Sequence, residues 1–188
     1  MLLDEIKSRT SRHHRQVEAD LDIMSETFTI EDYRRLLGRF YGYIRPWEER
    51  ARAGLGEEVA IFEGREKAAR IEDDLRFLGL GDDELAALPR CGEVPALESA
   101  PAALGSMYVF EGATLGGQII TRHLSKRFGL TGGGGTFFNS YGDDVGRKWK
   151  AFREILIAHS SPEADPAIVG AAVETFERFG RWLKGRRA

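Results

Sequence analysis

The fold depends on the stretch Gly105-Ser106-Met107-Tyr108-Val109-Phe110-Glu111-Gly112-Ala113-Thr114-Leu115-Gly116-Gly117-Gln118-Ile119-Ile120. It is framed as part of one long helix, because Ser99-Ala100-Pro101 is a helix-start signal and Phe128-Gly129 is a stop signal. Glycines nevertheless interrupt the apolar pattern in the middle of this helix. Each costs about 1 kcal/mol relative to alanine in a helix interior, so the cluster needs a physical reason.

The glycines form a bare stripe along one side of the helix. At about 100° per residue, Gly105, Gly112 and Gly116 fall within roughly 40° of one another. Tight helix packing is the simpler explanation for a single glycine pair. The cluster Gly112-x-x-x-Gly116-Gly117 also permits a bend and lets peptide groups touch a flat ligand or a diatomic molecule. A dinucleotide or phosphate loop is excluded, because no strand precedes the glycines and no lysine follows in the required place.

Composition and periodicity indicate one all-α domain over residues 1–188. The chain is 42% hydrophobic, which is enough for a substantial core and argues against disorder. Apolar residues recur at helical spacing nearly throughout, and no hairpin turn is flanked by alternating strands. Beyond the glycine-bearing helix, we expect a capping box at Thr29-Ile30-Glu31-Asp32 to open a helix whose buried side runs from Tyr33 to Trp47. We also expect a flexible surface loop at Thr131–Thr136, and helices near Leu3–Leu21, Glu58–Leu78, Asp83–Leu88, Asp144–His159 and Pro162–Leu183.

The charge pattern excludes several classes of partner. The formal net charge of −3 favours neither nucleic acid nor an acidic membrane surface. The chain has no apolar run near the ~18 residues that a membrane span needs, and its charged N-terminus lacks the apolar core of a signal peptide. Cys91 is the single cysteine, so neither an internal disulfide nor a cysteine metal site is possible. We therefore expect a cytoplasmic protein.

The first helix carries a candidate ligand for a metal. His14 lies on the apolar line of this helix, whereas His13 lies about 100° away on the side expected to face solvent. Lys7 shares nearly the azimuth of His14, roughly 10 Å along the axis. In one explanation, His14 is a packed core residue and Lys7 extends to the helix end. In the other, both meet a ligand that has a metal at one end and a carboxylate roughly 10 Å away, and haem has that shape.

Two motifs and their order give the chain a resemblance to the haem oxygenase family. The first helix of that family carries Thr-x-x-x-His-x-x-x-Glu, which is Thr10-Ser11-Arg12-His13-His14-Arg15-Gln16-Val17-Glu18 here. Its distal helix carries Gly-x-x-x-Gly-Gly-Gln, which is Gly112-Ala113-Thr114-Leu115-Gly116-Gly117-Gln118 here. The segments Lys67-Ala68-Ala69 and Asp74-Leu75 also resemble the family, and the helical content agrees over nearly the whole chain. The form of the distal motif most resembles the bacterial enzymes that supply biliverdin to bacteriophytochromes.

The resemblance implies a function and a set of site residues. Haem would be both cofactor and substrate, held between the first helix and a kinked distal helix, with His14 as the proximal iron ligand. O2 would react on the opposite side beside Gly112 and Gly116, with Gly117 adjoining. The products would be biliverdin, iron and carbon monoxide. Glu18 would orient the ring of His14, as carboxylates behind metal ligands do.

The chain departs from the family pattern at one position, and other contacts stay open. Mammalian-type members have an aspartate after the first distal glycine, which organises a water network, but this chain has Ala113. The resemblance places Tyr108 near a propionate, and Lys150 and Arg153 are the cations expected to meet the propionates. Propionate placement sets which meso carbon is cut, so the regiospecificity stays open.

Three other interpretations are alternatives to haem cleavage. A haem carrier or sensor would bind through His14 without turnover, and Ala113 favours this alternative. A di-iron carboxylate protein would need paired Glu-x-x-His motifs, and the chain has none. A helical interaction domain would leave Lys7 and the glycine stripe without a cause.

The resemblance also implies an electron donor. A ferredoxin, flavodoxin or reductase would supply electrons, and a bacteriophytochrome is a possible recipient of the product. Such a donor could dock on a basic cluster, although a run of charges is usually a solvated face. The cluster consists of Arg147, Lys148, Lys150 and Arg153.

Overall fold

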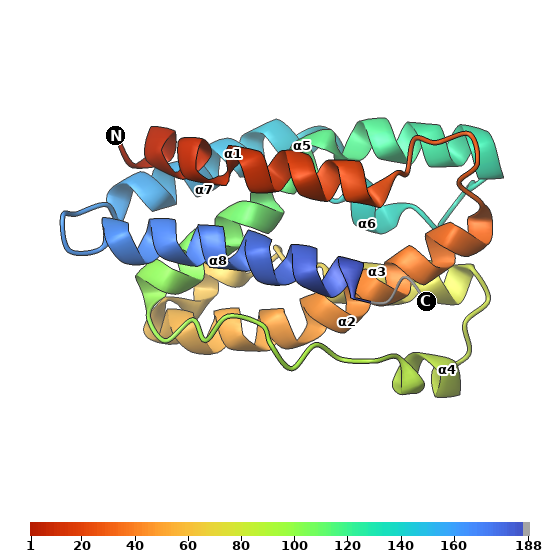
Figure 1. Cartoon of the computed structure of the whole chain (residues 1–188), viewed down its shortest axis with the longest axis horizontal. Coiled ribbons are helices and arrows are strands. Elements are labelled where there is room, and N and C mark those ends of the chain that lie inside the picture. Colours follow the sequence, from red (N-terminus) through yellow and green to blue (C-terminus); the bar gives the residue numbers. More distant parts are fainter. Residues whose placement is uncertain (186–188) are drawn as a thin grey trace.

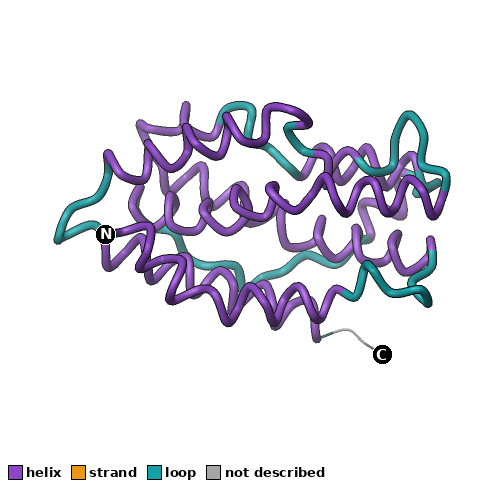
Figure 2. The backbone as a smooth tube through the Cα atoms, turned by 90° about the horizontal axis from the view of Figure 1, so that it is seen from above, coloured by secondary structure: helices purple, strands orange, loops and turns teal. Residues whose placement is uncertain are grey.

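The computed structural model describes residues 1–185, and every regular element in that part of the chain is a helix (Figures 1 and 2). The predicted all-α class is confirmed. Residues 186–188, the end of the expected domain 1–188, lie outside the described residues. The elements are α1 (Leu2–Leu21), α2 (Ile30–Leu55), η1 (Gly56–Phe62), α3 (Ala68–Phe77), α4 (Asp82–Ala87), α5 (Ala100–Phe128), α6 (Thr136–Asn139), η2 (Gly142–Asp144), α7 (Val145–Ala158) and α8 (Asp165–Lys184).

The long helix α5 organises the packing. It contacts α8, α2, α6 and α7, while α1 lies mainly on α8 and makes little direct contact with α5. In Figure 1 the first half of α5 rises obliquely through the molecule and its second half turns to run along the top of the view, which is the bend expected of this helix. Ser99 caps its start by accepting a hydrogen bond from the Ala102 amide, and Gly129 ends it in the left-handed conformation, as predicted.

The capping box of α2 forms as the sequence predicts. The Asp32 amide donates to the Thr29 hydroxyl, and the Thr29 amide donates to the Asp32 carboxylate at 2.9 Å. The helix continues past Trp47, the last apolar residue expected on its buried side, to Leu55. Its inner face supplies much of the core, including the buried residues Tyr33, Leu37, Phe40, Tyr43, Ile44 and Trp47.

The predicted helix over Glu58–Leu78 is wrong in its middle. The chain forms the short helix η1, breaks, and begins again as α3. Gly64, with φ +68°, turns the chain within the break, and Arg65 and Lys67 point inward and are buried. The break has a physical reason, because both cations pair with the Glu111 carboxylate of α5, and a continuous helix would carry them elsewhere.

The glycine-rich loop before α6 is not the flexible surface loop that the sequence predicts. Gly134 and Gly135 are buried, and the Tyr33 hydroxyl donates to the Gly134 carbonyl at 2.7 Å. A Cβ added to Gly133 would lie 2.5 Å from the Phe77 ring. The glycines therefore let this loop pack closely on its neighbours, rather than giving it freedom.

The carboxylate of Asp74 anchors the start of α6. Its Oδ1 accepts hydrogen bonds from the Thr136 amide at 2.9 Å and the Thr136 hydroxyl at 2.8 Å, and its Oδ2 accepts one from the Phe137 amide at 2.8 Å. The side chain is fully buried. Asp74 thus fixes the helix that presents Phe137 and Phe138 to the cavity described below.

We expect Asp74→Ala to lower the free energy of unfolding by about 3 kcal/mol, because it leaves two backbone amides and a hydroxyl without their acceptor. Denaturant unfolding followed by circular dichroism measures this. The exposed neighbour Asp73 supplies the matched control, and Asp73→Ala should change the value by less than about 0.5 kcal/mol. Equal effects of the two substitutions would contradict the anchoring role.

Candidate active site

Two adjoining cavities form a cleft between α1 and α5. The inner cavity has a volume of about 310 Å³ and the outer one about 520 Å³. Both are bounded by residues of α1, α5 and α8, the three helices that the packing brings together here. The residues that line both cavities are His14, Val109, Gly112, Ala113, Leu115 and Phe176.

The two cavities differ in chemistry. The inner cavity is walled by aromatic side chains from four helices, namely Phe40, Phe110, Phe137, Phe138, Phe176 and Phe179. The outer cavity has a larger polar share in its lining, and its charged residues are the cations Lys7, Arg15 and Arg153 and the anion Asp4. The cleft as a whole therefore suits a ligand with a large apolar body and an anionic edge.

His14 lies at the junction of the two cavities. Its imidazole is about half exposed, with 47% of the side chain accessible, and Nδ1 lies 3.2 Å from the Glu18 carboxylate one turn later. The other nitrogen, Nε2, makes no hydrogen bond to any residue in the described part of the chain, and the ring edge faces Phe176 with centroids 5.8 Å apart. A carboxylate on one ring nitrogen and a free second nitrogen are the usual arrangement of a metal-binding histidine.

The prediction that His13 faces solvent is wrong. Its side chain is 20% exposed, less than that of His14, and its Nε2 lies 3.8 Å from Glu177 of α8. The reason is tertiary, because α8 covers this side of α1. His13 lines neither cavity of the cleft, so it does not compete with His14 as a ligand.

The expected propionate-binding residues divide between cleft and surface. Lys7 is exposed on the wall of the outer cavity rather than directed into the core, and Tyr108 and Arg153 line the same cavity. Burial raises the pKa of the Tyr108 hydroxyl, and the Arg153 guanidinium acts in the opposite direction. Lys150 is not brought to the cleft, since its side chain is 79% exposed and its ammonium lies 4.0 Å from Glu154.

The glycines of α5 have two distinct uses. A Cβ added to Gly105 or to Gly117 would lie 2.0 Å from a backbone carbonyl oxygen, of Ile168 and Phe138 respectively, so both permit tight packing. A Cβ added to Gly116 would meet nothing within 4 Å, and one on Gly112 would only touch Trp149 at 3.6 Å. Gly112 and Gly116 therefore leave bare backbone on the wall of the cleft.

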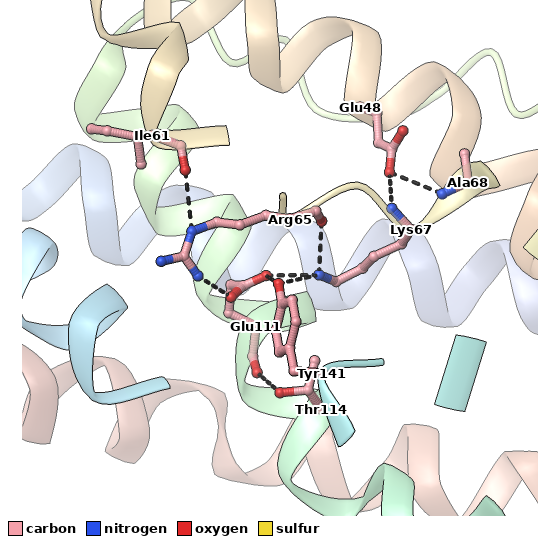
Figure 3. A network of polar contacts seen from close by, with 8 residues as sticks. All are labelled: Glu48, Ile61, Arg65, Lys67, Ala68, Glu111, Thr114 and Tyr141. Carbon is pink, nitrogen blue, oxygen red and sulfur yellow. Dashed lines mark hydrogen bonds and ion pairs between the residues drawn. The ribbon is translucent and has the colours of Figure 1, made fainter. Parts of the chain in front are cut away.

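A buried polar cluster behind the inner cavity was not predicted from the sequence (Figure 3). The Glu111 carboxylate binds the Arg65 guanidinium, the Lys67 ammonium at 2.7 Å, and the Tyr141 hydroxyl at 2.7 Å. Burial and the charge of Glu111 raise the pKa of Tyr141. Glu111 could have indicated this cluster from the sequence. A carboxylate inside an apolar helical stretch needs polar partners when it is buried.

Comparisons with known proteins agree with this geometry. The family model described as "Heme oxygenase" matches residues 1–185. A protein named "Heme oxygenase" from Xanthomonas campestris pv. campestris (strain 8004) is 32% identical over 146 residues, which are 75% of this chain and 82% of the relative. The chain belongs to the haem oxygenase family. It is thereby assigned to the oxygenases that degrade haem.

Solved haem oxygenases share the fold. The enzyme from Leptospira interrogans superposes with a TM-score of 0.79 over 98% of both chains, at 18% identity. Heme oxygenase-1 from Synechocystis sp. PCC6803, solved in complex with heme, gives 0.75 over 99% of this chain and 92% of that one, at 18% identity. Heme oxygenase 2 from Chlamydomonas reinhardtii, solved without heme, gives 0.72 over 97% and 96%, at 19% identity.

The residues of the cleft fit haem as the ligand of a haem oxygenase. His14 offers a free imidazole nitrogen, Gly112 and Gly116 leave bare backbone on the wall, and the aromatic inner cavity adjoins an outer one that carries three cations. Within residues 1–185, no group of three or more His, Cys, Asp or Glu side chains is placed to hold a metal ion, so a di-iron centre gains no support. None of the described helices is long and apolar enough to cross a membrane.

Proposed function

We propose that the cleft binds haem with His14 as the iron ligand. We further propose that the enzyme cleaves the macrocycle, consuming O2 and electrons and releasing biliverdin, iron and carbon monoxide. The observation that carries this proposal is that the free imidazole nitrogen of His14 and the bare backbone of Gly112 and Gly116 belong to the same aromatic cavity. One wall supplies a ligand and the other leaves room for a small molecule.

Each group of residues has a binding or orienting role. The Glu18 carboxylate holds Nδ1 of His14, which keeps Nε2 available and fixes the ring. The phenylalanines exclude water from the porphyrin face, while Lys7, Tyr108 and Arg153 face the propionates. Bound haem supplies both the iron at which O2 is reduced and the carbon that is oxidised. Gly112 and Gly116, with Gly117 behind them, shape the space beside the iron and so restrict which meso carbon is reached.

The electron donor is proposed to be a ferredoxin, flavodoxin or reductase in the cytoplasm, with a bacteriophytochrome as a possible recipient of biliverdin. Support comes from the resemblance and from the basic cluster on α7. Two of its cations are engaged locally, since Arg147 pairs with Asp144 at 2.9 Å and Lys150 with Glu154. These exposed pairs are weak and leave the cations accessible to an acidic partner.

A haem carrier or sensor is the second candidate function. The observation that favours it is Ala113, which lines both cavities without offering a polar group where mammalian-type members of the family have an aspartate. Such a protein would bind haem through His14 and leave the macrocycle intact.

Titration with haemin followed by reduction in air tests both functions. For the enzyme, we expect a one-to-one complex whose main absorption band decays on addition of reductant, with the spectrum of biliverdin appearing. Catalase is included to exclude attack by free peroxide, and haemin with reductant alone is the control. A complex that persists under reductant supports the carrier or sensor, and failure to bind haem contradicts both.

A further inference from the structure

We propose that Lys67 is a positioning residue of this site: its ammonium orients a water molecule on the α5 side of bound haem, in place of the acidic side chain that Ala113 lacks. This inference rests on the proposed function. It concerns a residue on the loop before α3, remote in sequence from both motifs that identify the family. Figure 3 shows Lys67 and its partners from close by.

Lys67 lines the inner cavity and is bonded to α5, the helix that carries the open glycines. Among the described residues that line this cavity, the ionisable side chains are His14, Glu18 and Lys67, and the first two belong to α1. Lys67 is instead bonded to Glu111, the residue of α5 that immediately precedes Gly112. Its charge is therefore tied to α5, the helix of the two open glycines, whereas the proposed iron ligand belongs to α1.

The ammonium is held in a fixed position. Nζ donates to Glu111 Oε1 at 2.7 Å, to the Arg65 carbonyl at 3.1 Å, and to the Tyr141 hydroxyl at 3.4 Å. The Glu48 carboxylate accepts hydrogen bonds from the backbone amides of Lys67 and Ala68, which fixes the loop. The side chain is only 4% exposed, so its orientation is set by these contacts rather than by solvent.

The cluster contains two cations and two carboxylates, and Lys67 is the member that lines the cavity. Glu111 is shared by two cations, because Arg65 and Lys67 each bind one of its oxygens. Tyr141 is uncharged, and Glu48 is directed to the backbone of the loop. The three hydrogens of the Lys67 ammonium already have acceptors. The longest of these contacts, 3.4 Å to the Tyr141 hydroxyl, is the one that a water in the adjoining cavity can replace.

Two hydroxyls complete the setting for a water molecule. Thr114 and Ser140 line the same cavity as Lys67. The Thr114 hydroxyl donates to the Glu111 carbonyl at 2.7 Å, which leaves its oxygen lone pairs free to accept. A water that accepts from Lys67 and donates to such a hydroxyl has the two polar partners that an ordered site needs.

The alternative is that Lys67 merely ties the loop to α5. The ferric haem complex distinguishes the two roles, since its absorption spectrum changes when the water on the iron loses a proton. A cation beside that water favours hydroxide, so Lys67→Met should raise the midpoint pH of this transition by about one unit. Lys67→Arg, which keeps the charge, should stay within about 0.3 unit of the wild type. Glu111→Gln removes the opposing charge and should lower the midpoint.

Lys148 provides the matched control. Its ammonium lies over the same Tyr141 ring, 5.5 Å from the centroid against 5.3 Å for Lys67, but it lines neither cavity. Lys148→Met should therefore move the midpoint by less than about 0.3 unit, because solvent screens this partly exposed charge. A midpoint that is unchanged in Lys67→Met, or that shifts equally in both variants, overturns the proposal.

Two further outcomes are separable from these. If the wild type binds no haem, the proposed function fails rather than this inference. If circular dichroism shows that Lys67→Met does not fold, Glu111→Gln and Lys67→Arg decide the question. A lowered midpoint pH in Glu111→Gln together with a preserved midpoint in Lys67→Arg supports the proposal, and any other pair of results overturns it.

Discussion

Replacing His14 by alanine is expected to abolish the histidine-ligated haem spectrum and to lower turnover more than about a hundredfold, since loss of groups behind a metal ligand alone costs 10–100-fold. The imidazole has the one free ring nitrogen that the cleft offers from α1 among the described residues. His14 is half exposed, so the free energy of unfolding should change by less than about 1 kcal/mol. Absorption spectra with haemin and denaturant unfolding measure the two effects, and added imidazole should restore part of the spectrum.

His13→Ala is the matched control for this experiment. His13 is the adjacent residue on the same helix, but it approaches Glu177 outside the cleft. Its replacement should leave the haem spectrum and turnover unchanged. Loss of the ligated spectrum in His13→Ala, together with its retention in His14→Ala, would overturn the assignment of the iron ligand.

Replacing Gly116 by leucine is expected to reduce turnover by about tenfold or more while haem still binds. The new side chain meets no protein atom near its Cβ and so extends into the space proposed for the small ligand beside the iron. Removing a glycine from a helix interior also favours the fold by up to about 1 kcal/mol. The variant should therefore be at least as stable as the wild type, which single-turnover spectra and unfolding curves test together.

Gly117→Ala is the control that separates the cleft from the fold. Its added methyl would lie 2.0 Å from the Phe138 carbonyl oxygen, so the backbone of α6 must move. We expect a loss of about 2 kcal/mol or more in the free energy of unfolding, although the substitution is small. If Gly116→Leu and Gly112→Leu both leave turnover unchanged, the role of the bare backbone in the reaction is contradicted.

Much of the fold follows from local signals. The start and stop of α5, the capping box of α2 and the helical period of the apolar residues predicted most elements to within a few residues. Each signal acts within one or two turns of chain. The helix predicted over Glu58–Leu78 is interrupted because of a contact between distant segments, which local signals cannot predict. Arg65 and Lys67 leave the helical path to pair with Glu111, which lies far along the chain.

The candidate site was predictable where a residue's role depends on its own helix. His14 and Glu18 are one turn apart on α1, and Gly112 and Gly116 are one turn apart on α5, so spacing alone placed each pair on one side of its helix. Lys150 could not be placed in this way. The register of α7 against the cleft depends on how that helix packs, and it turns Lys150 outward while Arg153 lines the outer cavity.

The sequence by itself determined the all-α class, the main helices and the two motifs that place the chain in the haem oxygenase family, because these depend on local periodicity, capping and residue identity. The tertiary structure decided which neighbour covers each side of a helix. It buried His13 more than His14, divided the glycines between packing and the cleft, and gathered Lys67 and Glu111 behind the inner cavity. Helical periodicity specifies the faces of a helix, but only the packing of distant segments determines what each face meets.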